Sequence, residues 1–307
     1  MGAGVRNSAF SVAITAALLL ALAGCRGNQK RTIAVIPKGT SHQFWVSVQR
    51  GAEKAGKEFN VNLEWSGPPQ ETEYGRQLEI LDAMINRKVD GIAVAATDKK
   101  VLSQSIDRAM ELGIPVTVFD SGVDTENYVS FVATNNYEAG KMGARELGKL
   151  LGGKGKVAMV ANAPGSVSTM DRERGFTDAL AAEFPGILLV ATQFGMADHA
   201  KAMNATENIL TAHNDLNGFF ASSEPSSVGI AQALKGRNLQ GKVKVVAFDQ
   251  SDSMTADCKA GVIDAMVIQD PEKMGYEAVK TVVDKLNGKT PAKRIELDAR
   301  VLRKGDL

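Results

Sequence analysis

Two stretches of this sequence decide its fold: Ile114-Pro-Val-Thr-Val-Phe-Asp120 and Lys244-Val-Val-Ala-Phe-Asp249. Each is a short apolar run that ends in Phe-Asp, a pattern typical of a strand buried on both faces of a parallel sheet. Ligands of open α/β sheets bind beyond the carboxyl ends of the strands, so an Asp in that position is a candidate ligand contact. The pair therefore predicts two similar sheets whose terminal Asp120 and Asp249 face each other across a cleft.

The same alternation of apolar runs and helical spacing extends outward from both stretches. Apolar runs fall at 32–36, 61–65, 91–95, 115–119 and 129–133, and then at 156–160, 188–192, 218–221, 243–248 and 265–268. Helical spacing covers 43–59, 71–87, 99–112, 137–151, 168–183, 197–212, 226–234 and 251–260. Asp270-Pro271-Glu272 is a strong helix start and predicts a last helix over 271–286, closed by Gly288. Strands that alternate with helices predict an α/β protein of two doubly wound parallel-sheet domains.

Length and composition limit the possible functions. The chain has 307 residues, 44% hydrophobic and 23% charged, which suits two globular domains. Since 36 basic residues face 35 acidic ones, the net charge is +1 and no nucleic-acid partner is expected. Two Cys and three dispersed His favour no disulfide framework and no metal site, and we expect no cofactor. No nucleophile elbow or activated Ser is present, so we predict no enzyme.

The N-terminal segment predicts a targeting signal. Residues 1–24 carry one charge, Arg6, followed by an uncharged run with an Ala/Leu centre, which is typical of a signal peptide. A transmembrane anchor is the alternative, but polar residues dilute the run below the roughly 20 apolar residues that a span needs. The run ends in Leu22-Ala-Gly-Cys25, which resembles the bacterial lipoprotein lipobox. That resemblance implies an acylated Cys25, unless Cys25 is an ordinary small residue, with residues 25–30 as a tether to the outside of a bacterial membrane.

Further short motifs follow one another in a characteristic order. They are Phe44-Trp45, Asp90-Gly-Ile92, Gly113-Ile-Pro115, Phe119-Asp120, Thr134-Asn-Asn136, Arg172-Glu-Arg-Gly-Phe176, Leu210-Thr-Ala-His-Asn-Asp215, Phe248-Asp249 and Gln269-Asp-Pro271. With this order and spacing, residues 30–302 resemble the ribose-type periplasmic sugar-binding proteins, soluble receptors of bacterial ABC importers with the type I periplasmic-binding fold. The resemblance implies a three-strand hinge near Thr134, Gln269 and Leu297 and a last helix that returns to the N-terminal lobe. It also implies lobes formed by 31–134 plus 270–296 and by 135–269 plus 297–307.

The resemblance also implies a set of sugar contacts. Phe44 and Trp45 would clamp the apolar face of a ring. Asp120, Arg172 and Asp249 would grip hydroxyls, and Gln269 would offer a donor and an acceptor at the hinge. Four positions depart from the ribose pattern, because the expected Arg, Asn, Asn and aromatic residue fall on Ser121, Ser223, His42 and Ala197. These departures predict a roomier, differently polar pocket around His42, Ser121 and Ser223, and they leave the sugar open.

Plainer interpretations of the same residues stay open. Phe44 and Trp45 could belong to the core, Asp120 and Asp249 could be turn residues, and Arg172 could lie on a solvated helix face. As a whole, the sequence predicts a monomeric receptor that closes on a sugar or polyol and docks on an ABC permease. The alternative is a sensor subunit that binds a signalling molecule or nucleoside and acts on a chemoreceptor or kinase. A repressor is disfavoured, because no helix-turn-helix precedes the first strand.

Overall fold

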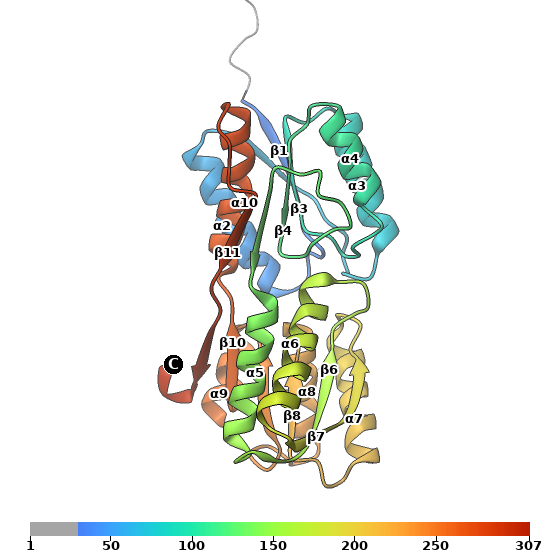
Figure 1. Ribbon diagram of the computed structural model, residues 1–307, viewed down its shortest axis with the longest axis vertical. Helices are drawn as coiled ribbons and strands as arrows, with labels where there is room; N and C mark the ends of the chain where they lie inside the picture. Colours follow the sequence, from blue (N-terminus) through green and yellow to red (C-terminus); the bar gives the residue numbers. More distant parts are fainter. Residues whose placement is uncertain (1–29) are drawn as a thin grey trace, which may run out of the picture. The chain divides into compact units, whose positions relative to one another are not determined.

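The structure is a computed structural model that describes residues 30–307. The predicted signal peptide, Cys25 and most of the tether lie outside the described residues. Residues Thr32–Leu307 form one compact unit, which contains two sheets of six strands each (Figure 1). Among residues 30–307, no helix combines the length and the apolar character needed to cross a bilayer.

The N-terminal lobe is a parallel sheet covered on both faces. Its strand order is β2 (Asn62–Trp65), β1 (Thr32–Ile36), β3 (Gly91–Val94), β4 (Val116–Phe119), β5 (Ser130–Thr134) and β11 (Arg294–Leu297). Helices α2 (Gln43–Glu58) and α10 (Pro271–Leu286) cover one face, and α3 (Tyr74–Asn86) and α4 (Ser103–Glu111) cover the other (Figure 1). Successive residues of β1 enter opposite cores, Ile33 and Val35 on one side and Ala34 and Ile36 on the other. This is the burial on both faces that the continuous apolar runs predict.

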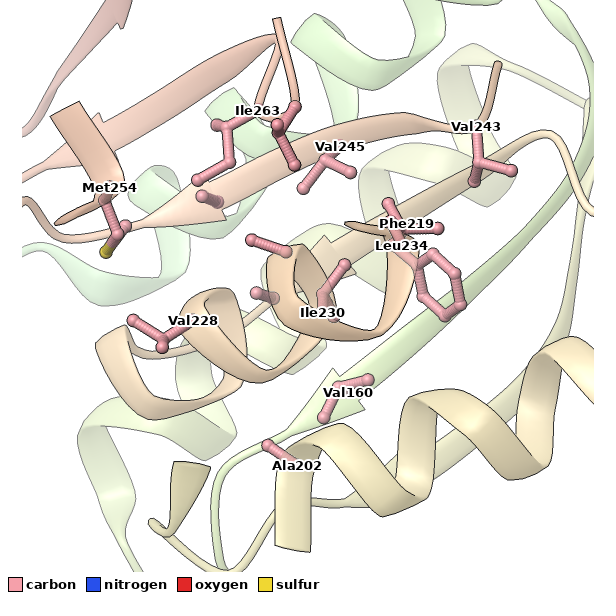
Figure 2. Packing of buried hydrophobic residues seen from close by; sticks show 14 of the residues in the cluster. Val160, Ala202, Phe219, Val228, Ile230, Leu234, Val243, Val245, Met254 and Ile263 are labelled. Carbon is pink, nitrogen blue, oxygen red and sulfur yellow. The ribbon is translucent and has the colours of Figure 1, made fainter. Parts of the chain in front are cut away.

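The C-terminal lobe repeats the same strand order. It runs β7 (Gly186–Phe194), β6 (Lys154–Ala161), β8 (Gly218–Ala221), β9 (Lys244–Phe248), β10 (Ala265–Ile268) and β12 (Arg300–Arg303), with only β12 antiparallel. Helices α5 (Asn136–Leu150) and α6 (Val167–Glu183) cover one face. Helices α7 (His199–Ala212), α8 (Glu224–Gly236) and α9 (Asp252–Ala260) cover the other. Figure 2 shows the core between this sheet and helices α7 to α9. In it, Val160, Phe219 and Val245 of the strands pack against Ile230 and Leu234 of α8.

Three chain crossings connect the lobes. They lie between β5 and α5, between β10 and α10, and between β11 and β12. Thr134 Oγ1 donates to Gln269 Oε1 at 2.7 Å, and the Asn135 N–H donates to the Leu297 carbonyl at 3.3 Å, so the crossings are bonded to one another. The predicted three-strand hinge is confirmed. The last helix packs on α2 in the N-terminal lobe, which confirms the expected return.

Each lobe also contains a helix pair in backbone contact. A Cβ on Gly51 of α2 would lie 1.8 Å from the Glu272 carbonyl oxygen of α10. In the other lobe, a Cβ on Gly140 of α5 would lie 2.0 Å from the Arg172 carbonyl oxygen of α6, and Gly175 approaches the Tyr137 carbonyl equally closely. Since real Cβ atoms do not approach this closely, only glycine permits these crossings.

Two differences from the sequence-based expectation affect the site or the sheets. The helix expected over 71–87 begins at Tyr74, because hydrogen bonds from Trp45 and His42 hold the Glu71 carboxylate outside it. Strands β11 and β12 were not among the expected strands, because each is a four-residue segment with two charged residues and partial exposure. Both are edge strands, where burial supplies no continuous apolar run.

Candidate functional site

A cavity of about 20 Å³ lies between the lobes at the carboxyl ends of the strands. Eight of the nine predicted ligand contacts line it, namely His42, Phe44, Trp45, Asp120, Arg172, Ser223, Asp249 and Gln269, together with Lys38, Glu71, Asn162, Thr169, Glu224 and Pro225. Ser121 does not line it. The Ser121 Oγ instead accepts a hydrogen bond from the Ser168 N–H at 3.3 Å, which joins the lobes beside the cavity. This free volume holds about one water molecule, so a larger ligand enters only when the lobes or the lining side chains move apart.

The two strand-terminal aspartates have the same backbone geometry. Asp120 has φ +57° and Asp249 has φ +71°, and such left-handed conformations are tolerated by Asp better than by most side chains. Each N–H donates to the neighbouring strand, to the Val132 carbonyl at 2.9 Å and to the Val267 carbonyl at 2.8 Å. The same turn therefore directs a carboxylate into the cavity from each lobe.

The N-terminal side of the cavity holds a buried ion-pair network. Lys38 Nζ lies 3.2 Å from Asp120 Oδ2 and 3.6 Å from Glu71 Oε2, and all three side chains are at least nine-tenths buried. Burial alone would lower the pKa of Lys38, but the charges of Asp120 and Glu71 outweigh it and raise that pKa. Burial would likewise raise the pKa of Glu71, but Lys38, His42 and Trp45 hold it well below its usual range. Both groups are therefore ionised at neutral pH.

The aromatic pair belongs both to the core and to the cavity wall. Phe44 and Trp45 meet edge to face with ring centroids 5.0 Å apart, and both pack in the core with Phe119. Trp45 Nε1 donates to Glu71 Oε1 at 2.8 Å, so its polar edge faces the cavity. Phe44 and Trp45 therefore lie in the core and also line the cavity.

Arg172 is buried, with 3% of its surface exposed, so the solvated-face interpretation is wrong. Its Nε donates to Asn136 Oδ1 at 2.7 Å and its Nη1 donates to the Ser222 carbonyl at 3.0 Å. The guanidinium carbon lies 3.9 Å from the centre of the Phe248 ring, within the range of a cation–π contact. These contacts fix the guanidinium at the cavity wall.

The charge of Asp249 is less completely paired than the charges of Asp120 and Glu71 in the N-terminal lobe. It accepts hydrogen bonds from Gln269 Nε2 at 2.7 Å and from the Glu224 N–H at 3.1 Å, while Arg172 Nη1 stays 4.0 Å away. Burial raises the pKa of Asp249, and Arg172 and Gln269 only partly offset this. Its carboxylate therefore favours an added hydrogen-bond donor.

Ser223 has a mainly structural set of contacts. It caps α8 by accepting from the Ser226 N–H, and its Oγ donates to Asn162 Oδ1 at 2.9 Å. The Asn162 amide reaches Glu71 Oε2 of the other lobe at 3.4 Å. Ser223 thus orients a polar group that spans the cavity.

Two histidines that are far apart in the sequence meet at the edge of this cavity, which His42 lines. The His42 and His199 ring centroids are 5.6 Å apart, and His199 Nε2 lies 3.2 Å from Glu224 Oε2. His42 Nδ1 lies 3.3 Å from Glu71 Oε1. Burial would lower the pKa of His42, but Glu71 outweighs it and raises that pKa. The wide spacing of the histidines in the sequence disfavoured a metal site, but folding brings two of them together.

Sequence reasoning missed several residues of the cavity wall. Lys38 and Asn162 follow β1 and β6 almost directly, so the argument that selected Asp120 and Asp249 could have found them. Glu71 and Glu224 had no such signal, because one lies in a loop and the other opens a helix like many surface acids.

Comparisons with known proteins agree on one family. The family model described as periplasmic binding protein domain matches residues 33–290. The D-allose-binding periplasmic protein of Escherichia coli is 29% identical over 259 residues, covering 82% of this chain and 83% of that protein. The ribose import binding protein of Haemophilus influenzae is 28% identical over 291 residues, covering 94% and 98%. A carbohydrate transporter solute binding protein from Agrobacterium radiobacter, solved in complex with D-arabinose, has a TM-score of 0.89 and 30% identity, covering 91% and 96%.

Proposed function

The chain belongs to the periplasmic binding protein family, among its ribose-type sugar-binding members, and from that premise we propose that the cavity binds a monosaccharide or related polyol for delivery to an ABC permease. This family consists of extracytoplasmic transport receptors, and we propose no catalytic step. The observation that carries the proposal is that eight residues expected to contact a sugar line one cavity between the lobes.

The chemistry of the cavity wall supports a neutral polyhydroxylated ligand. Trp45 and Phe44 offer apolar surface for the C–H face of a ring. Asp120, Arg172 and Asp249 offer charged hydrogen-bond partners, which bind hydroxyls more strongly than neutral partners do. A ligand that lacks one of these hydroxyls would leave a buried charge unpaired, at about 1–3 kcal/mol or more.

Hinge closure supplies the transport signal in this proposal. Hydrogen bonds already join the lobes across the cavity, from Lys38 to Ser166 at 3.0 Å and from Asn162 to Glu71 at 3.4 Å. A sugar that touches both lobes binds the closed form more tightly than the open form and shifts the population toward it. The permease would then recognise the closed form.

We also propose the processing and organisation that the sequence predicts. Residues 1–24 would be removed as a signal peptide, Cys25 would carry the lipid, and residues 25–30 would tether a monomer to the membrane. The lobes would comprise 31–134 plus 270–296 and 135–269 plus 297–307. The sheet memberships of β11 and β12 support this division.

The decisive test is a thermal-shift screen of the purified protein against monosaccharides and polyols, followed by calorimetric titration of each hit. A ligand at 100 times its Kd stabilises the fold by about 2.7 kcal/mol, which is readily detected. Arg172→Ala should abolish the shift. The matched control is Arg174→Ala on the same helix, where the side chain is exposed and pairs with Asp171. The absence of any stabilising sugar or polyol would contradict the proposal.

A further inference from the structure

Three side chains of types that bind metals come together at the edge of the cavity, and of these only His42 is also a proposed sugar contact. Among residues 30–307, His42, His199 and Glu224 each offer a ligand atom within 4.8 Å of the others. His42 precedes α2 in the N-terminal lobe, whereas His199 and Glu224 open α7 and α8 in the C-terminal lobe. The group therefore exists only when the lobes are together.

His42 has the supporting contact that metal-binding histidines usually have. Its Nδ1 lies 3.3 Å from the Glu71 carboxylate, and Trp45 Nε1 holds the same Oε1 at 2.8 Å. A histidine that directs one ring nitrogen to a carboxylate has its orientation fixed and its other nitrogen made more basic. The arrangement leaves His42 Nε2 for a further ligand.

The charges of the cavity wall also favour a bound cation. Lys38, Arg172 and the imidazole of His42 line it, against four acids, Glu71, Asp120, Glu224 and Asp249. Glu224 is 4% exposed, and the His199 Nε2 atom lies 3.2 Å from its carboxylate. A divalent ion beside Glu224 would add positive charge where carboxyl groups outnumber basic side chains.

We propose that His42, His199 and Glu224 form a zinc-type metal site that links the two lobes at the edge of the cavity. Two imidazoles and one carboxylate are a ligand set that zinc accepts, with a fourth position left for water or a ligand hydroxyl. Ligand atoms on a tetrahedral zinc with bonds of about 2.0–2.1 Å lie roughly 3.3 Å apart. His199 Nε2 and Glu224 Oε2 already have that spacing, and the partly exposed His199 side chain can move to bring in His42.

The test is a calorimetric titration of the tag-free, metal-stripped protein with ZnCl₂ in the absence of sugar. We expect one saturable site per chain. A Co²⁺-loaded sample should show the intense visible absorption of a four-coordinate site. His199→Ala and Glu224→Gln should each weaken zinc binding by at least about tenfold, because even the loss of a supporting residue weakens metal sites 10- to 100-fold.

The matched control is His213→Ala, since His213 lies at the far end of α7 and outside the group. It should leave the zinc affinity unchanged. His42→Asn tests the link between the lobes, because His42 is the only zinc ligand from the N-terminal lobe in this proposal. Unchanged zinc affinity in His42→Asn, or equal losses in all variants including His213→Ala, would overturn the proposal, as would the lack of a saturable site. Because no sugar is present, failure of the sugar proposal would leave this result intact.

Discussion

Asp120 and Asp249 occupy the same place in the two lobes, but they meet different partners. Each follows the fourth strand of its sheet, with the same left-handed backbone and the same hydrogen bond to the next strand. Asp120 has an ammonium group at 3.2 Å, whereas the nearest cation to Asp249 is a guanidinium nitrogen at 4.0 Å. The pKa of Asp249 is consequently raised by burial, with Arg172 and Gln269 as only partial compensation.

The two lobes repeat one fold, but the carboxylates at equivalent positions have different roles. The N-terminal side is a closed ion-pair network that is satisfied without any ligand. The C-terminal side keeps a carboxylate that is more stable when a further donor arrives. A buried charge that is incompletely paired reduces the stability of the free protein. A ligand whose hydroxyl groups donate hydrogen bonds to that charge removes this cost, and the recovered free energy strengthens binding.

The largest effect should come from removing the cation of the N-terminal network. Lys38→Met leaves Asp120 and Glu71 buried without their partner, and breaking a buried pair in this way costs about 3–5 kcal/mol. Urea denaturation would measure the loss. Lys99→Met removes an exposed lysine 3.7 Å from Asp124 and should cost at most about 1 kcal/mol. Equal losses of unfolding free energy in the two variants would show that removing Lys38 leaves no costly unpaired charge in the network.

A smaller effect should follow from forcing apart the helix pair of each lobe. Gly140→Ala places a Cβ against the backbone of Arg172, and Gly51→Ala does the same against Glu272. Overpacking of this kind typically costs about 1–3 kcal/mol, so both variants should melt earlier. Gly140→Ala should also displace Arg172 and weaken sugar binding in a calorimetric titration. An unchanged sugar affinity in Gly140→Ala would contradict the proposed role of Arg172 as a sugar contact.

Next in size is the effect of pH through Asp249. Because its pKa is raised in the folded state, the folded protein binds this proton more tightly than the unfolded chain does. Protonation of Asp249 therefore contributes stability that is fully present below the unfolded pKa of about 3.9 and is lost as pH rises through the raised value.

Asp249→Asn removes this titration. The difference in free energy of unfolding between Asp249→Asn and the parent protein should shift in favour of the variant as pH rises toward neutrality. Denaturation at several pH values without sugar would measure it, with Asp171→Asn as control, because the Asp171 side chain of α6 is 38% exposed. A pH-independent difference would show that Asp249 keeps an ordinary pKa.

The smallest effect should come from the hinge. Thr134→Val keeps the shape of a buried side chain but removes the donor to Gln269 Oε1. The loss of one hydrogen bond should cost about 0.5–1.5 kcal/mol and loosen the amide that holds Asp249. Sugar affinity should fall by several-fold in a calorimetric titration. Unchanged affinity and stability would mean that the crossings do not support one another.

The sequence predicted those parts of the site that depend on strand position. The two Phe-Asp strand ends indicated both sheets and both aspartates, because apolar runs and parallel-sheet geometry are local properties. Glu71 was assigned to a helix, because the Trp45 and His42 contacts that hold it outside come from another element. The meeting of His42 with His199 depends on how the two lobes approach each other, and no local pattern encodes that.

The packing of α10 on α2 has a consequence for how this chain folds. The helix that completes the N-terminal lobe is the last one in the sequence, and β11, which completes its sheet, comes later still. The N-terminal half must therefore wait, with α2 as the only helix on one sheet face, until nearly the whole chain has been made. Contacts of such long sequence separation slow folding and extend the time during which apolar surface is exposed. The C-terminal lobe lacks only the short edge strand β12 at that stage, so it should be the first lobe to become native.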